Sequence, residues 1–179
     1  MLPRPCLFSW ASGLTISNVK MLGRVVKRNT ISNNGWEAKE EEKGKFGYVA
    51  TKANATFEFE LKNIHGMVQT LNFMHMKSYG EKWDGSKLRV DVSVIKKKTS
   101  ALEEDNVVIE KYIKMTGFHD KNTSETYTSQ LYLNDDGETN CNGNGGLKGI
   151  VDAGDDLRVR FRLIGGSTFK IMWMAFCDH

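Results

Sequence analysis

Residues 157–163 read Leu-Arg-Val-Arg-Phe-Arg-Leu, an unbroken alternation of apolar and charged side chains. Successive side chains of a β-strand point to opposite faces of its sheet, so this period of two predicts a strand with one face in a core and one in water. Residues 57–61 (Phe-Glu-Phe-Glu-Leu) and 88–94 (Leu-Arg-Val-Asp-Val-Ser-Val) alternate in the same way. The pattern therefore predicts three half-buried strands.

Two other segments, 67–78 and 167–177, are apolar at consecutive positions, which predicts central strands covered on both faces. Helical spacing is not sustained anywhere, and turn residues separate the apolar runs. We expect an all-β fold, an antiparallel two-sheet sandwich that is jelly-roll-like. The Gly165-Gly166 pair predicts a tight hairpin between two neighbouring strands. About eight strands are expected, near 46–51, 55–62, 67–78, 86–95, 106–114, 125–133, 156–164 and 167–177.

A length of 179 residues fits one domain, which we place at residues 35–179. Residues 1–34 form an N-terminal segment, read either as a signal or anchor sequence or as a linker. The chain is predicted not to span a membrane, because no apolar run approaches the roughly 18 residues that a spanning helix needs. The net charge of +3 is small, and cations and anions are interleaved, so nucleic acid is not an expected partner.

The sequence predicts no enzyme. It lacks the nucleophile motif Gly-x-Ser-x-Gly, the zinc motif His-Glu-x-x-His and a phosphate-binding loop, and its four histidines are scattered. His75, between two methionines, is interpreted as a hydrogen-bonded core or surface side chain. A glycosidase-type hydrolase stays open, because its two carboxylates can come from different strands. The candidates for that pair are Glu58, Glu60, Asp91 and Glu110.

Two sets of side chains are candidates for ligand binding. Aromatic residues near expected turns could stack on sugar rings or could be core-edge residues: Trp36, Tyr48, Tyr79 and Trp83. Arginines on one strand face, with one more on a neighbouring strand, could hold carboxylate, sulfate or phosphate groups: Arg158, Arg160, Arg162 and Arg89. The alternative is that these arginines pair across strands with Glu58, Glu60 or Asp91.

The loop 135–144 carries oxygen-bearing side chains at every second position, which is the ligand chemistry that calcium prefers. Its metal candidates are Asp136, Glu138 and Asn140, with Asn142 and Asn144 following, and Asp152, Asp155 and Asp156 as helpers. The alternative is a plain polar loop without a cofactor. Cys141 and Cys177 could form a disulfide, with Cys6 left over, or all three thiols could be reduced. Asn54 and Asn122 stand in N-glycosylation sequons, which matter only in the secretory pathway.

Several short stretches together suggest a family: Gly35-Trp36, the run 40–51 from Glu40 to Thr51, residues 76–80 (Met-Lys-Ser-Tyr-Gly) and residues 166–171 (Gly-Ser-Thr-Phe-Lys-Ile), ending near Cys177. Residues 35–177 thereby resemble a β-sandwich domain of secreted or Golgi-type proteins of algae and other microbial eukaryotes. That domain is often C-terminal to an SGNH-type hydrolase or a glycosyltransferase domain. The resemblance implies a secreted or extracellular accessory module with no catalytic residue of its own.

Two functions from different classes follow. The first is a non-catalytic accessory module that binds a carbohydrate or glycoconjugate, with aromatics near residues 36, 79 and 83 as its platform and the arginines favouring acidic glycans. The second is a structural β-sandwich used for assembly, such as a cell-surface or capsid-like subunit. Homo-oligomer formation without sugar binding would favour the second.

Overall fold

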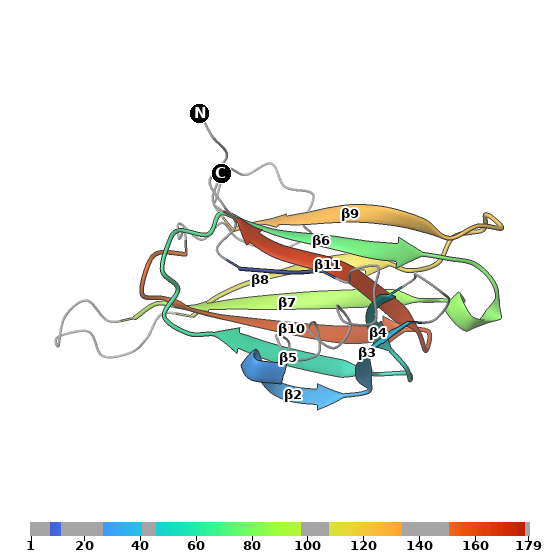
Figure 1. Ribbon diagram of the computed structural model, residues 1–179, viewed down its shortest axis with the longest axis horizontal. Coiled ribbons are helices and arrows are strands. Elements are labelled where there is room, and N and C mark those ends of the chain that lie inside the picture. Colours follow the sequence, from blue (N-terminus) through green and yellow to red (C-terminus); the bar gives the residue numbers. More distant parts are fainter. Residues whose placement is uncertain (1–7, 12–26, 41–45, 98–107, 134–150, 178–179) are drawn as a thin grey trace.

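A computed structural model describes residues 8–11, 27–40, 46–97, 108–133 and 151–177. These ranges form two antiparallel sheets (Figure 1). Sheet A has the order β3 (Trp36–Glu40), β4 (Phe46–Ala50), β11 (Phe169–Cys177), β6 (Thr70–Lys77) and β9 (Glu125–Tyr132), with β1 (Phe8–Ala11) also paired to β11. Sheet B has the order β2 (Thr30–Asn34), β5 (Thr56–Leu61), β10 (Asp156–Gly165), β7 (Lys87–Ile95) and β8 (Val108–Thr116). A 3-10 helix, η1 (Glu81–Trp83), precedes β7.

The eight strands from β4 to β11 confirm the predicted all-β sandwich. Consecutive strands mostly change sheets, so that β4, β11, β6 and β9 lie side by side in one sheet and β5, β10, β7 and β8 in the other. This is the jelly-roll arrangement. β10 and β11 come late in the chain but lie in the middle of their sheets. Each therefore pairs with strands that come much earlier in the sequence.

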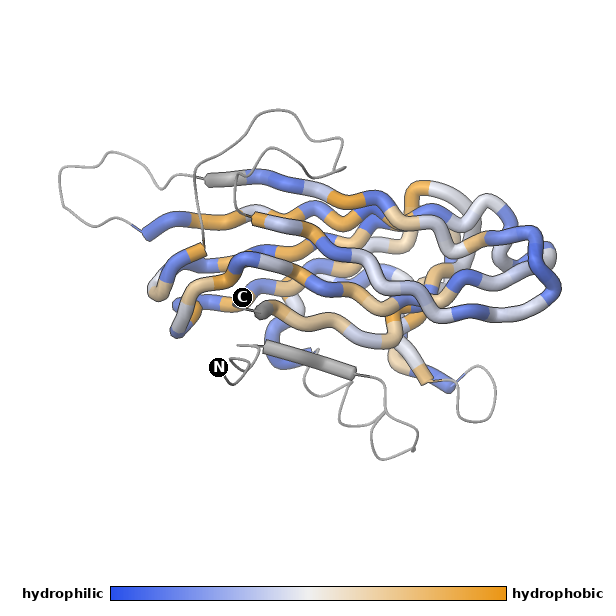
Figure 2. The backbone as a smooth tube through the Cα atoms, turned by 90° about the horizontal axis from the view of Figure 1, so that it is seen from above, coloured by the Kyte–Doolittle hydropathy of each residue, from blue (hydrophilic) through white to orange (hydrophobic). Residues whose placement is uncertain are grey.

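The core lies between the sheets and is rich in aromatic rings. Apolar and polar residues alternate along the strands (Figure 2), and the apolar ones meet in the interior. Phe161 on β10 is central: its ring lies 5.8 Å from Phe57 on β5 and 6.1 Å from Phe73 on β6 of the opposite sheet. The rings of Phe59 on β5 and Phe176 on β11 also pack across the two sheets, with 6.1 Å between their centroids. Each fully buried ring contributes about 1.5–3 kcal/mol.

The predicted hairpin at Gly165-Gly166 is wrong. β10 pairs on its two sides with β5 and β7, so neither edge is open to β11, which lies in the other sheet. The glycines instead carry the chain from one sheet to the other. Gly166 has a φ of +68°, and a Cβ there would lie 2.8 Å from the carbonyl oxygen of Asp84. Only glycine combines this backbone conformation with such a close approach.

A second crossing lies at residues 33–36, where the side chain of Asn33 holds the corner. Its amide donates to the carbonyl oxygen of Trp36 at 2.9 Å, and its Oδ1 accepts from the Trp36 backbone N–H at 3.0 Å. Gly35 follows in the left-handed region with a φ of +87°. β2 before this corner pairs with β5, so the sandwich includes residues before the predicted start at 35. β1, β2 and β3 were not among the strands expected from the sequence.

Candidate functional site

The predicted aromatic platform is largely buried. Trp36 is 4% exposed and Trp83 is 5% exposed, so the prediction that they present rings to a ligand is wrong. Trp36 packs in the core, where its ring lies 5.8 Å from those of both Tyr48 and Phe161. Tyr48 is equally buried, and burial raises the pKa of its phenol. Tyr79 is the one member of this set that is well exposed, at 42%.

The predicted arginine stripe lies on the outer face of sheet B, and each of its four arginines has a carboxylate partner. Arg158 donates to Glu60 at 2.9 Å, and Arg160 donates to Glu58 at 2.9 Å. On the next strand, Asp91 accepts from Arg162 at 2.8 Å. These contacts confirm the cross-strand pairing that the sequence offered as the alternative.

The same ion pairs occupy three of the four carboxylates that could have served a hydrolase. Glu58 contacts Arg158 with one oxygen and Arg160 with the other. Glu60 contacts Arg158 and Lys62, again with different oxygens. Asp91 contacts Arg89 and Arg162 in the same manner. Every oxygen of these three carboxylates therefore has a cationic neighbour.

The outer face of sheet A has a different character. The register of β11, β6 and β9 places its side chains in cross-strand rows. One row contains Trp173, Met74 and Thr128. The next row contains Ala175, Asn72 and Gln130. The third row contains Thr70 and Tyr132. Since Phe73 and Leu71 point into the core, the alternating residues of β6 face outward. We call these three rows the sheet A face.

A chain of hydrogen bonds crosses the polar part of the sheet A face. The hydroxyl of Tyr132 donates to Gln130 Oε1 at 2.8 Å, and Gln130 Nε2 donates to Asn72 Oδ1 at 2.7 Å. The Asn72 amide lies 3.5 Å from Thr70 Oγ1. These contacts fix the direction of both amides and hold the Tyr132 side chain, which is 39% exposed, along β9. Gln130 and Tyr132 are exposed, whereas Asn72 and Thr70, which are 6% and 1% exposed, hold the chain from below.

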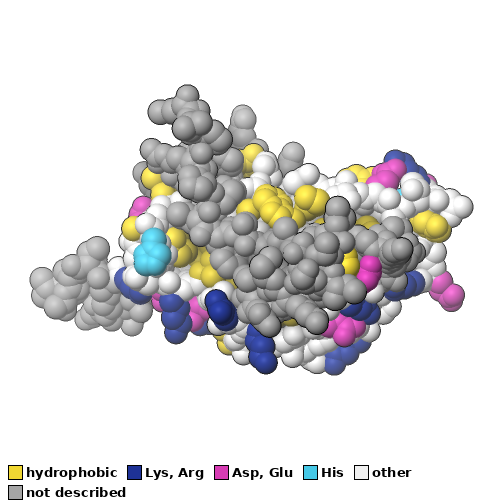
Figure 3. Space-filling view, viewed as in Figure 1, with side chains coloured by type: hydrophobic (Ala, Val, Ile, Leu, Met, Phe, Trp, Pro, Cys, Tyr) yellow, Lys and Arg dark blue, Asp and Glu magenta, His cyan; other side chains and the backbone are white. Residues whose placement is uncertain are grey.

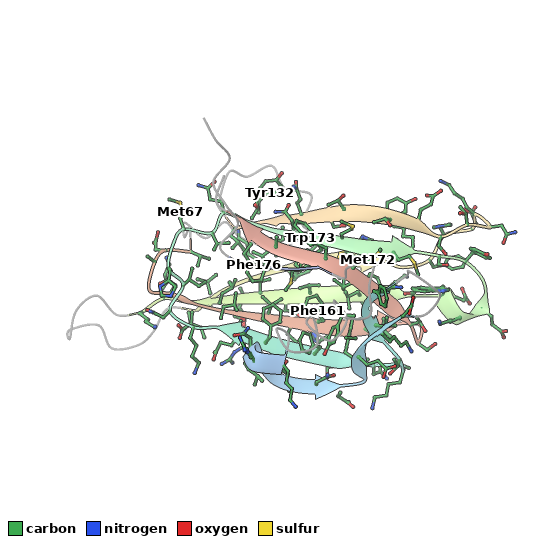
Figure 4. The ribbon with its side chains drawn as sticks, in the orientation of Figure 1. Met67, Tyr132, Phe161, Met172, Trp173 and Phe176 are labelled. Carbon is green, nitrogen blue, oxygen red and sulfur yellow. The ribbon has the colours of Figure 1, made fainter. Side chains whose placement is uncertain are left out.

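An apolar and aromatic part adjoins this chain. Trp173 and Met172 lie on β11 and Tyr132 lies on β9, at the same surface (Figure 4). Hydrophobic atoms are visible over β6 and β11 in the space-filling view (Figure 3). Trp173 is half-buried, and a bulge between Ile171 and Trp173 interrupts the pairing with β6. The sheet A face thus combines one indole, one phenol and the exposed amide of Gln130, with the amide of Asn72 buried beside it.

Directly beneath this face, His75 of β6 points into the interior. It is 2% exposed, and its Nε2 lies 3.1 Å from Ser129 Oγ. Its ring stacks on Phe169 at 5.5 Å. Burial, and secondarily the positive charge of Lys77, lower the pKa of His75 to about 4. These contacts confirm the predicted hydrogen-bonded core histidine, which supports the sheet from inside.

Several predicted sites fall outside the described residues. Asp136, Glu138, Asn140 and Cys141 lie in 134–150, and the side chain of Cys177 is not described. Within the described ranges, no three His, Cys, Asp or Glu side chains gather as a metal site. The two carboxylate oxygens of Asp155, one of the calcium helpers, accept from the backbone N–H groups of Lys97 and Asp152. Asn54 and Asn122 are both exposed. No helix in the described part of the chain is long and apolar enough to cross a membrane.

Sequence reasoning missed Trp173, Tyr132, Asn72 and Gln130 as site residues. A signal for part of the set exists on β9, where residues 126, 128, 130 and 132 (Thr, Thr, Gln, Tyr) share one face at a period of two. Trp173 carries no such signal. It stands in a run of apolar residues, and the bulge beside it shifts the alternation, so the pattern does not reveal which face it occupies.

No protein-family model matches this chain, and no curated protein matches it. Among solved structures, it is similar to the C-terminal family 6 carbohydrate-binding module of a marine laminarinase from Zobellia galactanivorans, with 11% identity, 96% of this chain and 98% of that chain covered, and a TM-score of 0.43. A family 6 module of a lichenase from Cellvibrio mixtus, solved with cellotriose, gives 9% identity, 98% and 99% coverage and a TM-score of 0.44. A family 22 xylan-binding domain from Paenibacillus barcinonensis gives 8% identity, 98% and 96% coverage and a TM-score of 0.44.

Proposed function

We propose that this chain is a non-catalytic module that binds carbohydrate across the sheet A face. The observation that carries this function is the arrangement of Trp173 and Tyr132 beside the exposed amide of Gln130, which is hydrogen-bonded to the buried Asn72. The rows run over three neighbouring strands, so the two aromatic residues lie diagonally, roughly 16 Å apart between their Cα atoms for regular strand spacings. A face of that length accommodates more than one sugar ring.

The chemistry of this face suits a sugar. The faces of a pyranose ring are made of C–H groups that pack on an aromatic ring, while its edges carry hydroxyls that donate and accept. Trp and Tyr provide large apolar area with a polar end. A side-chain amide can both donate and accept, so the exposed Gln130 matches hydroxyls of either role. Because its hydrogen bond to the buried Asn72 fixes Gln130 before a ligand arrives, little conformational entropy is lost on binding.

The absence of catalysis in this proposal is supported by sheet B. Glycoside hydrolysis requires one carboxyl group that gives a proton and a second that acts as base or nucleophile. Glu58, Glu60 and Asp91 are each held between two cations. Glu110, the remaining candidate, is exposed on β8 opposite Ser93 of β7, and Asp91 in the next row is the carboxylate that Arg89 and Arg162 hold.

A glycan array probed with the purified chain tests this function. We expect the chain to bind a neutral glycan. Its affinity should fall at least about tenfold in Trp173→Ala, the magnitude typical of a central interface aromatic. Gln130→Ala should weaken it less. Tyr79→Ala is the matched control, because Tyr79 is a well-exposed aromatic in the loop before η1 and lies outside the sheet A face.

Running the array with calcium and with a chelator tests the calcium loop at Asp136, Glu138 and Asn140. Equal loss in Tyr79→Ala and Trp173→Ala would contradict the assignment of the face. No binding to any glycan, together with a concentration-dependent oligomer in size-exclusion chromatography, would instead establish the structural, assembly-forming alternative.

A further inference from the structure

The outer face of sheet B contains one row of cations that its carboxylates do not balance. Arg162 of β10 lies opposite Arg89 of β7, and Arg89 lies opposite Lys114 of β8. Three positive side chains therefore occupy adjacent strands over about 10 Å. Like charges directly opposite each other destabilise a sheet. Within the described ranges, Asp91 is the one carboxylate that forms ion pairs with members of this row.

Asp91 accepts hydrogen bonds only from the Nε atoms of Arg89 and Arg162. Its Oδ1 accepts from Arg89 Nε at 2.6 Å, and its Oδ2 accepts from Arg162 Nε at 2.8 Å. The two outer nitrogens of each guanidinium, Nη1 and Nη2, have no acceptor among the described residues. These side chains are 31% and 41% exposed, so the outer nitrogens reach the surface. Two adjacent forks of N–H donors remain, a geometry that matches the oxygens of a carboxylate or sulfate.

The neighbouring ring of Tyr112 helps to hold this arrangement. The Arg89 guanidinium carbon lies 4.0 Å from the centroid of the Tyr112 ring, and Lys114 Nζ lies 5.7 Å from it. A cation is attracted to the face of an aromatic ring, so the tyrosine restrains both side chains without neutralising their charge. Arg89 is therefore held by a hydrogen bond from its Nε to Asp91 and by the contact of its guanidinium group with the Tyr112 ring. Its outer fork is oriented before any anion binds.

The other end of the same strand shows what a balanced arginine looks like. Arg160 contacts Glu58 with both Nε and an outer nitrogen, at 2.9 and 2.8 Å. Arg158 places an outer nitrogen on Glu60 at 2.9 Å. One outer nitrogen of Arg158 and one of Arg160 thus each have a carboxylate partner, whereas those of Arg162 and Arg89 have none among the described residues. At this end Arg158, Arg160 and Lys62 share two carboxylates, whereas Arg162, Arg89 and Lys114 have Asp91 alone among the described residues.

We propose that Arg162, Arg89 and Lys114 form a second binding site, which takes the oxyanion group of an acidic glycan, either a sulfate ester or a uronate. The choice of a glycan as the carrier of this group rests on the proposed function. The site lies on the opposite sheet from the sheet A face, so the two can be disabled separately. Arg162 and Arg89 bind the oxygens through their outer N–H groups, and Lys114 adds a point charge.

Affinity electrophoresis of the full chain tests this site in gels containing dextran sulfate, polygalacturonate or neutral dextran at about 0.15 M salt, where long-range charge effects are screened. We expect Arg162→Gln and Arg89→Gln to weaken retention by the charged polymers about tenfold, the effect of losing a charge-assisted hydrogen bond. Arg162→Lys should lose most of this affinity as well, because it keeps the charge but not the fork. Retention by dextran sulfate alone, or by polygalacturonate alone, identifies the oxyanion.

Arg158→Gln is the matched control, since it removes the same charge from the same strand at a side chain that is 42% exposed. We expect it to change retention less than about twofold. Lys114 forms no ion pair within the described residues, so Lys114→Gln gives a variant that leaves every carboxylate partner in place and should still weaken retention. Equal losses in Arg158→Gln and Arg162→Gln, or no retention by either charged polymer, would overturn the proposal.

Trp173→Ala separates this inference from the proposed function. If the two sites are independent, Trp173→Ala loses neutral glycans and retains the charged polymers, whereas Arg162→Gln does the reverse. A protein retained by dextran sulfate through Arg162 that binds no neutral sugar would refute the sheet A face and leave the oxyanion site standing. The opposite pattern would refute the oxyanion site alone.

Discussion

His75 provides a direct test of how tightly the interior is sealed beneath the sheet A face. In the folded chain its pKa is lowered to about 4, chiefly because burial penalises the charged imidazolium. In the unfolded chain it is expected at its ordinary value of about 6.5. Between these values the unfolded state binds a proton that the folded state does not, so falling pH favours unfolding. This contribution lowers the free energy of unfolding by about 2 kcal/mol at pH 5 and about 3 kcal/mol at pH 4 relative to pH 8.

The measurement is urea unfolding of the wild-type chain and of His75→Gln between pH 8 and pH 4. A glutamine does not titrate, and its amide can still reach Ser129, which His75 contacts at 3.1 Å. Carboxylates elsewhere titrate in both proteins, so the difference between the two curves isolates the histidine. That difference should be flat above about pH 7 and should favour the glutamine variant increasingly below about pH 6. Parallel curves over the whole range would show that His75 titrates normally and that the interior there is open to water.

Three further predictions concern stability. Phe161→Ala should cost about 3–5 kcal/mol in urea unfolding, because Phe161 contacts rings from both sheets; a loss below about 1 kcal/mol would place it outside the core. Glu58→Gln should cost about 1–2 kcal/mol, since it weakens two ion pairs at a carboxylate that is 6% exposed; salt should reduce the difference, and an unchanged midpoint would contradict the pairing. Gly166→Ala should lower the melting temperature more than Gly80→Ala does, because both glycines have a positive φ but only at Gly166 would the new Cβ have backbone atoms within 3 Å; equal losses would mean that backbone strain alone matters.

The sandwich could be predicted from residues because its information is local. Each apolar-polar alternation, as in residues 157–163, reports which side of one strand faces the core, whatever strands lie next to it. β2 and β3 were not predicted because they contain too few apolar residues to show an alternation. β2 (Thr30–Asn34) has a single apolar residue, and only Trp36 of β3 is fully buried. The hairpin at Gly165 was predicted wrongly because a glycine pair signals a change of direction but not which sheet the chain enters next.

The candidate site was harder to predict, because exposure depends on distant segments. Trp36 and Trp83 stand beside turns, which favours exposure, yet both are buried, and the ring of Trp36 packs against Phe161 of β10, far away in sequence. The arginines show the same limit: their shared face was predictable, while the partner of each one depends on the register of β10 against β5 and β7. That register separates the balanced Arg160 from the unbalanced Arg162, two residues away.

The positions of β10 and β11 also determine when the protein can fold during synthesis. Each is a central strand of its sheet: β10 joins β5 to β7, and β11 joins β4 to β6. Until both strands have left the ribosome, the strand that separates β4 from β6 and the strand that separates β5 from β7 are missing. The two sheets cannot yet pack their apolar faces completely. Pairing between strands so distant in sequence is slow. Neither sheet can therefore be completed until nearly the whole sandwich has been translated.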